Sequence, residues 1–294
     1  MSSSPSVTRR PFFEKSNTEL TSSLRSNFSA HQPSQPASTT PPYKSWTTQT
    51  PSALYIPSHT PSPLSEPRDS YDITVKLFYL PNIPADRRCA QTREAIELVL
   101  KELGSTSIDL LIVSFPGISF DADDSDSDDD DDEPSPPQSS DGEEVPPEDI
   151  ETMITTWRSL EALQAEGLVQ KLGIAEFGVA RLGKFLEHTR IKPSVNQINV
   201  RDCCVVPKPL ILYAKQQQIE LLTHNDCTNI LPRGTLRQIL GEGEGGSGVL
   251  AGEANVEGLR GDVVPLWVVK YTAVVKDRGV VENKGYFAVA ELRE

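Results

Sequence analysis

From residue 71 onward, short apolar runs alternate with segments whose apolar residues recur at helical spacing. The short runs are rich in Val, Ile, Leu and Phe and end at polar or turn residues, which is typical of buried strands. They predict strands at 72–80, 108–115, 169–177, 194–200 and 219–226. The segments between them predict helices at 90–104, 149–168, 179–189 and 207–218. This alternation indicates a mainly parallel α/β domain.

The C-terminal region continues the pattern with longer apolar stretches. PLWVVKYTAVVK (265–276) is long and apolar enough to predict another helix. GVVENKGYF (279–287) predicts one or two further strands after that helix. The expected domain therefore extends over residues 71–294.

Residues 1–70 have a different composition, rich in Ser, Thr and Pro and poor in large aliphatic side chains. Such a segment buries too little apolar surface to offset its chain entropy, so we expect most of it to be disordered. A short helix is expected near 17–28, where Leu20 and Leu24 lie one turn apart and Glu19 falls in the first turn.

Two low-complexity segments interrupt the predicted domain. The first is an acidic insert at 118–147, around a run in which residues 121–149 hold fifteen Asp or Glu and no Lys or Arg. Without that run the net charge of −14 becomes +1, so the acidity belongs to one segment and nothing indicates a nucleic-acid-binding face. The second is a Gly-rich surface loop at 241–262, which contains GEGEGGSG. Both are expected to be flexible and solvated.

Cysteine and histidine usage argues against two classes of protein. Four cysteines with uneven spacing and no CxxC motif do not form a disulfide framework or a zinc site. The four histidines are scattered, so we expect no metal. The first residues lack the apolar core of a secretory signal, and no apolar run reaches the ~20 residues of a membrane span. We therefore expect a reduced, cytoplasmic protein.

The ends of the predicted strands carry a family resemblance. ELGSTSIDLLIVSFPG resembles the aldo-keto reductase segment whose strand ends in His-Trp-Pro, and TWRSLEALQAEGLVQKLGIAEFGVARL resembles the following part, which ends in GVSNF. SVNQINV is similar to that family's VNQ strand. The resemblance covers roughly residues 72–287 and implies a (β/α)8 TIM barrel, with chemistry at the carboxyl ends of its strands. No obvious first strand precedes residue 10; an incomplete N-terminus would account for this difference.

The resemblance implies a dismantled reductase site. Reductases of this family use a Tyr acid, tuned by Lys and Asp, and a His that orients the carbonyl. Lys76 matches the Lys, but Ser114 stands in place of the His, and no DTAxxY-type motif with the Tyr and Asp precedes Lys76. Gln197 matches the Gln of the family's VNQ strand, and His224 replaces the Tyr that stacks on nicotinamide. Each retained residue also has an ordinary structural interpretation, Lys76 as an ion-pair partner and Gln197 as a rim residue.

The cofactor residues depart from the family pattern as well. Ala175-Glu176 replaces the Ser-Asn pair that holds the carboxamide, and Glu176 would place a negative charge in the cofactor's path. Lys284 is a weak match to a late phosphate-site Lys. The resemblance therefore implies no bound cofactor and no catalytic residue, and Lys76, Ser114, Gln197 and His224 are expected to be remnants.

A narrower resemblance concerns NQINVRDCCVVPKPLILYAKQQQIELLTHND and VPLWVVKYTAVVKDRGVVENKGYFA. These stretches resemble the regulatory (modifier) subunits of glutamate–cysteine ligase, catalytically silent relatives of the aldo-keto reductases. That resemblance implies a heterodimer with the catalytic subunit, in which glutamate affinity rises and glutathione feedback is relieved. The alternative is a degenerate NADPH-dependent reductase. A rise in melting temperature on adding NADPH would favour the alternative.

Cys203 and Cys204 lie in a predicted strand-to-helix loop and have two interpretations. Adjacent cysteines are poorly placed to pair with each other, so an intrachain bridge is not expected. The interpretation favoured by side-chain size is two small residues that fill space. The other, implied by the family resemblance, is a redox-sensitive disulfide with the catalytic subunit.

Overall fold

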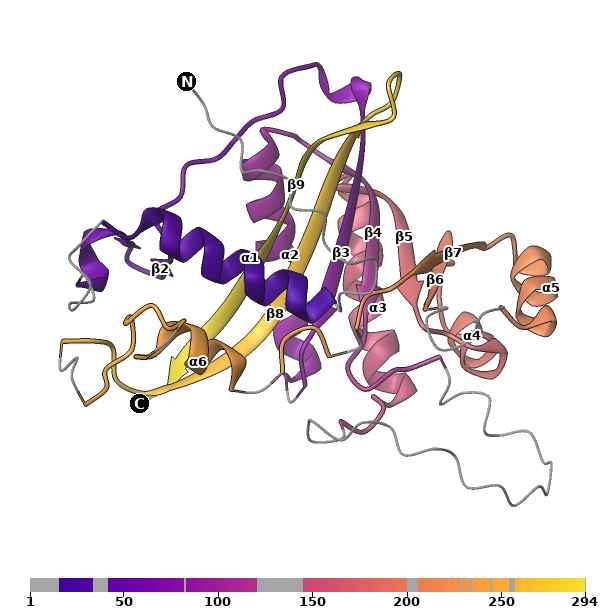
Figure 1. Ribbon diagram of the computed structural model, residues 1–294. Helices are drawn as coiled ribbons and strands as arrows, with labels where there is room; N and C mark the ends of the chain where they lie inside the picture. The colour runs from indigo at the N-terminus through magenta and orange to yellow at the C-terminus, as the bar shows by residue number, and fades with distance from the viewer. Residues whose placement is uncertain are drawn as a thin grey trace.

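The computed structural model describes residues 16–33, 42–81, 83–120, 145–199, 206–227, 229–232, 234–243, 245–253 and 257–293. In this part of the chain the main sheet has seven strands in the order β7-β6-β5-β4-β3-β8-β9 (Figure 1). Cys203, Cys204 and residues 121–144 of the acidic insert lie outside the described residues. No described helix combines the length and apolar character needed to span a membrane.

Five neighbouring strands of the sheet are parallel, as predicted. They are β3 (Tyr71–Tyr79), β4 (Ile108–Ser114), β5 (Val169–Ala175), β6 (Val195–Asn199) and β7 (Glu220–His224). The helices that connect them are α2 (Ala85–Leu103), α3 (Ile150–Ala165), α4 (Val179–Leu186) and α5 (Lys208–Gln217). The parallel α/β class and all nine of these predicted elements are confirmed.

Local sequence signals set the helix boundaries. Asp149 caps α3, because its carboxylate accepts the backbone N–H of Thr152 at 2.9 Å. Gly104 ends α2 with φ of 60°, a left-handed conformation that glycine adopts without steric cost. The buried faces of these helices pack on one face of the sheet, where Trp157 and Phe185 meet edge to face at 5.3 Å.

The prediction of a helix at 265–276 is wrong. Residues Asp262–Val275 form strand β8, which pairs antiparallel with β3 on one side and with β9 (Val280–Arg293) on the other. Val268 and Val269 are both fully buried, although neighbouring side chains of a strand point to opposite faces. A strand covered on both faces has a continuous apolar sequence, so its period cannot be distinguished from that of a buried helix.

The N-terminal region covers the face of β8 and β9 opposite α2. The helix expected near 17–28 is present as α1 (Ser16–His31), and it packs beside α6 (Thr235–Leu240), as Figure 1 shows. Leu20 of α1 is fully buried, and Phe28 contacts Trp46 with ring centroids 5.7 Å apart. These apolar anchors belong to a second core cluster on this face of the sheet.

The expectation of disorder does not fit residues 42–70. They contain two 3-10 turns (Tyr43–Ser45 and Arg68–Ser70) and the short hairpin β1 (Thr48–Gln49) and β2 (Leu54–Tyr55). The segment is fixed by long-range contacts: the backbone N–H of Leu64 donates to the Leu103 carbonyl at 3.0 Å. A Ser/Pro-rich sequence is ordered here because the domain supplies the apolar surface that the segment lacks.

The Gly-rich loop also differs from the expectation of a solvated loop. Val249 and Leu250 are buried in the second core cluster, and Leu250 forms a bridge with Leu259 before β8 begins at Asp262. A Cβ on Gly246 would lie 2.4 Å from the Gly241 carbonyl oxygen, so the turn requires glycine there. The described strands form an open sheet, with β7 and β9 at its edges.

Substitutions in β8 test its burial on both faces. Val268→Thr and Val269→Thr keep the side-chain shape and each place a hydroxyl in a different core cluster. We expect each to lower the free energy of unfolding by about 1–3 kcal/mol in urea titrations. Val281→Thr, at a side chain that is 46% exposed in β9, is the matched control and should change it by less than about 0.5 kcal/mol. If Val268→Thr or Val269→Thr left the free energy of unfolding unchanged, that result would contradict the burial of β8 on both faces.

Candidate functional site

Five polar side chains gather on one face of the sheet near the carboxyl ends of its parallel strands. They come from β3, from the residues after β5, from the end of β7 and its following loop, and from β8. We call them the buried ion-pair network: Lys76, Glu176, His224, Asp226 and Lys270.

The centre of the network is Asp226, which binds two lysines at once. Its Oδ2 lies 3.0 Å from Lys76 Nζ, and its Oδ1 lies 2.9 Å from Lys270 Nζ. Lys76 and Asp226 are almost fully buried, and Lys270 is partly exposed. Lys76 Nζ also lies over the Phe78 ring, 5.1 Å from its centroid.

The sheet register explains why a carboxylate is needed at this point. Lys76 in β3 lies directly opposite Lys270 in β8. Two like charges at directly opposite positions of a sheet repel each other, and burial strengthens the repulsion. Asp226 accepts from both ammonium groups and so converts a destabilising pair into a satisfied triad.

The pKa shifts follow from these contacts. Burial alone would raise the pKa of Asp226, but the two lysines outweigh burial and hold it well below its ordinary range. Burial lowers the pKa of the Lys76 ammonium, and Asp226 offsets part of that effect. Burial alone would also lower the pKa of Lys270, but Asp226 raises it above the ordinary value. The carboxylate is thus ionised at neutral pH and is not a proton donor.

His224 and Glu176 extend the network on the other side of Asp226. The backbone N–H of Asp226 donates to His224 Nδ1 at 3.0 Å, so Nδ1 is the acceptor and the neutral ring carries its proton on Nε2. His224 Nε2 contacts the Glu176 carboxylate, without the alignment of a hydrogen bond. Glu176 has φ of 67°, a strained conformation for a residue with a side chain, and it is 3% exposed.

Tyr286 is the phenol that lies beside the network. Its ring centroid is 5.7 Å from Lys270 Nζ, and its hydroxyl donates to Glu19 of α1 at 3.2 Å. Burial raises the pKa of Tyr286 to about 12, against a smaller opposing effect of Lys270. A tyrosine that donates protons in catalysis needs a pKa nearer the working pH, so the raised pKa of Tyr286 does not suit that role.

The structure brings the predicted remnant residues to one face of the sheet. Lys76 Nζ lies 3.4 Å from His224 Nδ1. Ser114 lies opposite Phe78 at the end of β4, and Gln197 lies opposite Ala175. Their origin as reductase-site remnants stays a prediction.

Lys284 lies apart from the other predicted residues. It is exposed in edge strand β9 and lies opposite Thr272 of β8. Because β8 runs antiparallel to β3, Thr272 is nearer than Lys270 to the start of β3. This position is away from the carboxyl ends of the parallel strands, where a phosphate group would bind in this kind of fold.

Two members of the network were missed by sequence reasoning. Asp226 was visible in the HND tripeptide at the end of a predicted strand, where a site residue is expected. Lys270 was assigned to a helix, so nothing placed it opposite Lys76. A β assignment for 262–275 would have shown two facing lysines and the need for an acid.

The network does not fit a nicotinamide cofactor. His224 contacts Glu176, and both side chains are almost fully buried. A buried carboxylate repels a phosphate-bearing cofactor, and Lys76 is committed to Asp226. Among the described residues, no group of three or more His, Cys, Asp or Glu is arranged to hold a metal ion. The contacts within the network tie its side chains to one another.

The fold and the position of the site match a known family. The aldo/keto reductase family model matches residues 58–228, which include β3 to β7 and all network members except Lys270. This chain belongs to the aldo/keto reductase family.

Within that family, the chain is similar to a particular group of proteins. It is 27% identical over 226 residues to the glutamate–cysteine ligase regulatory subunit of Mus musculus, covering 77% of this chain and 68% of the mouse protein. The human protein of the same name is 26% identical over 77% of this chain and 68% of its own length. Aldose reductase B of Dictyostelium discoideum is 32% identical, but over only 42% of this chain and 38% of that protein.

Solved structures give a partial overlap. An aldo-keto reductase from a deep-sea metagenome library is 23% identical, with a TM-score of 0.37 over 54% of this chain and 45% of the other. The aldose reductase of Schistosoma japonicum is 25% identical, with a TM-score of 0.35 over 50% and 43% of the two chains. The family assignment therefore depends on the family model.

Substitutions within the triad test its electrostatics. Asp226→Asn leaves two buried, facing lysines without a counter-charge and should lower the free energy of unfolding by about 3–5 kcal/mol. Lys76→Met should cost less, because Lys270 still neutralises Asp226. The double variant should recover part of the Asp226→Asn loss, since the repelling partner is gone. Additive losses in this cycle would contradict the triad.

The depressed pKa of Asp226 predicts a specific pH dependence. Its ionised form contributes stability above its ordinary pKa of about 4, and that contribution is lost as the pH falls toward the lower folded-state pKa. The stability difference between the wild-type chain and Asp226→Asn should therefore be full at pH 6 and narrow below about pH 4. Urea titrations over that range measure it, and a constant difference would contradict the shift.

Proposed function

We propose that this chain is a non-catalytic regulatory subunit that binds the catalytic subunit of glutamate–cysteine ligase as a heterodimer in the cytoplasm. The extent of similarity supports this function. The mouse regulatory subunit matches 77% of the chain, whereas the reductase from Dictyostelium matches 42%. A regulatory partner needs the fold but not its acid–base chemistry.

The observation that carries the proposal is that the side chains of the buried ion-pair network contact one another. In a reductase the Lys tunes a Tyr acid. Here Lys76 binds Asp226, and the position of the carbonyl-orienting His is taken by Ser114. Proton donation, carbonyl orientation and cofactor placement thus lack their residues, and the retained lysine serves a structural ion pair.

Regulation by binding requires a difference between states of the enzyme. The chain must bind one conformation of the catalytic subunit more tightly than another, because equal binding shifts no equilibrium. The proposed favoured conformation binds glutamate more tightly and glutathione less tightly. No covalent step on this chain is needed for either effect.

Reconstitution with the catalytic subunit tests the proposal directly. The purified chain alone should neither oxidise NADPH in the presence of aldehydes nor consume ATP with glutamate and cysteine. Mixed with the catalytic subunit, it should lower the apparent KM for glutamate several-fold, in line with the typical 5–150-fold range of allosteric couplings. An unchanged KM with the chain demonstrably bound would reject the regulatory function.

Lys76→Met separates regulation from residual chemistry. The variant should retain the effect on the glutamate KM, because no proton passes through Lys76. The assays are run below the melting temperature of the variant, so that its expected loss of stability does not unfold it during the measurement. The alternative, an NADPH-dependent reductase, is supported by family membership alone and requires saturating NADPH to raise the melting temperature of the wild-type chain. Loss of the KM effect in a folded, assembled Lys76→Met complex would show that the remnant site matters.

A further inference from the structure

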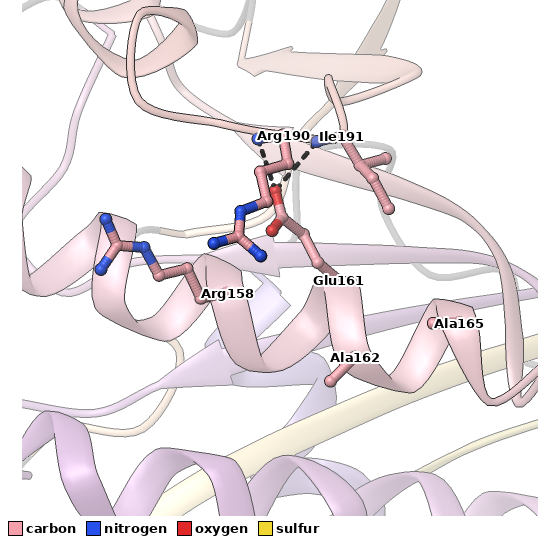
Figure 2. A pocket seen from close by; sticks show the side chains of 6 residues that line it. All are labelled: Arg158, Glu161, Ala162, Ala165, Arg190 and Ile191. Carbon is pink, nitrogen blue, oxygen red and sulfur yellow. Dashed lines mark hydrogen bonds between the residues drawn. The ribbon is translucent and has the colours of Figure 1, made fainter.

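A surface pocket of about 320 Å³ lies between α3 and the loop that leads from α4 to β6. This loop enters the amino end of β6, so the pocket is at the opposite end of the sheet from the buried ion-pair network. It has a volume in the range of small-molecule sites. Its lining, shown in Figure 2, consists of Arg158, Glu161, Ala162, Ala165, Arg190 and Ile191.

The loop side of the pocket is held rigidly by α3. Glu161 is 8% exposed, and its Oε1 accepts the backbone N–H groups of Arg190 at 2.8 Å and Ile191 at 2.9 Å (Figure 2). One turn earlier, the indole N–H of Trp157 donates to the Ile191 carbonyl at 2.8 Å. These three bonds fix the backbone of Arg190 relative to the helix, so the pocket is preformed.

The helix side follows from the α-helical period. Arg158, Glu161, Ala162 and Ala165 are spaced i, i+3, i+4 and i+7, so they share one face of α3. The two alanines leave room on that face, and with Ile191 they form an apolar floor. Figure 2 shows Arg158 extending from α3 away from Ala165, and Arg190 reaching from the loop to the side of Glu161 that faces Arg158.

These two arginines differ from most of the other arginines in the part of the chain that the structure describes. Seven arginines in the described residues pair with carboxylates: Arg68, Arg87, Arg88, Arg93, Arg237, Arg278 and Arg293. Among those same residues, Arg158 and Arg190 have no acidic partner within 4.0 Å, although both line a pocket that contains Glu161. Glu161 instead directs its Oε1 to the loop backbone.

We propose that this pocket binds a small dicarboxylate with a short aliphatic body. Each guanidinium offers a planar fork that matches one carboxylate, and the apolar floor contacts the carbons between the two. Glu161 lowers the positive charge of the pocket by one and so weakens binding of the anion. The site lies outside the reductase site, and its test needs neither the catalytic subunit nor the proposed function.

Calorimetric titration of the full chain with glutarate tests the proposal. Glutarate should bind with 1:1 stoichiometry, and butyrate, which has one carboxylate, should bind at least about tenfold more weakly. Arg158→Gln and Arg190→Gln should each weaken glutarate binding about tenfold or more, since each removes a charge-assisted pair. Arg278→Gln removes the same charge from a remote, exposed arginine and should leave the affinity unchanged.

Glu161→Gln gives a prediction of opposite sign. Its side-chain carbonyl still accepts from the loop backbone, while the negative charge is removed, so glutarate should bind several-fold more tightly. A general disturbance of the pocket would weaken binding instead. The proposal is overturned if glutarate does not bind at about 10 mM, far above a 1 mM dissociation constant. It is equally overturned if Arg278→Gln weakens binding as much as the pocket variants, or if phosphate binds and glutarate does not.

Discussion

The pairing of β3 with β8 is the constraint on which the rest of the structure depends. β3 is buried along almost its whole length, with Ile73, Val75 and Leu77 fully inaccessible. A strand so deeply buried needs hydrogen-bonded neighbours on both edges, because unpaired backbone groups away from water are costly. β4 supplies one neighbour, and β8, from far along the chain, supplies the other. The same pairing sets Lys270 against Lys76, and that juxtaposition requires Asp226.

The same pairing connects the fold to the buried ion-pair network. A lysine that tunes a catalytic acid must be free to interact with it. Once Lys76 faces Lys270, the Asp226 carboxylate is needed to offset both ammonium groups, and removing it leaves two buried lysines without a counter-charge. The network is therefore a consequence of the antiparallel C-terminal strands.

The sequence allowed most of the parallel part to be predicted, because its signals are local. Alternation, capping at Asp149 and the stop at Gly104 each depend on a few neighbouring residues. The β8 region could not be assigned in the same way, since burial on both faces removes the alternation that distinguishes a strand from a helix. The run from Trp267 to Val275 does contain β-branched and aromatic residues that favour a strand, but the partner strand decides the outcome.

The candidate site shows the same division between local and long-range information. Lys76 and His224 could be singled out because the family resemblance assigns reductase-site positions to them. Their shared contact with Asp226, and the completion of the triad by Lys270, depend on contacts between residues far apart in the sequence. Lys76 and Lys270, for example, are 194 positions apart. The arginine pocket has no sequence motif at all, because it arises from a helix face and a loop that meet only in the folded chain. The charged side chains at the strand ends pair with one another, whereas Arg158 and Arg190 of the pocket have no acidic partner within 4.0 Å among the described residues, so in the described structure the pocket offers unpaired charge to an anion.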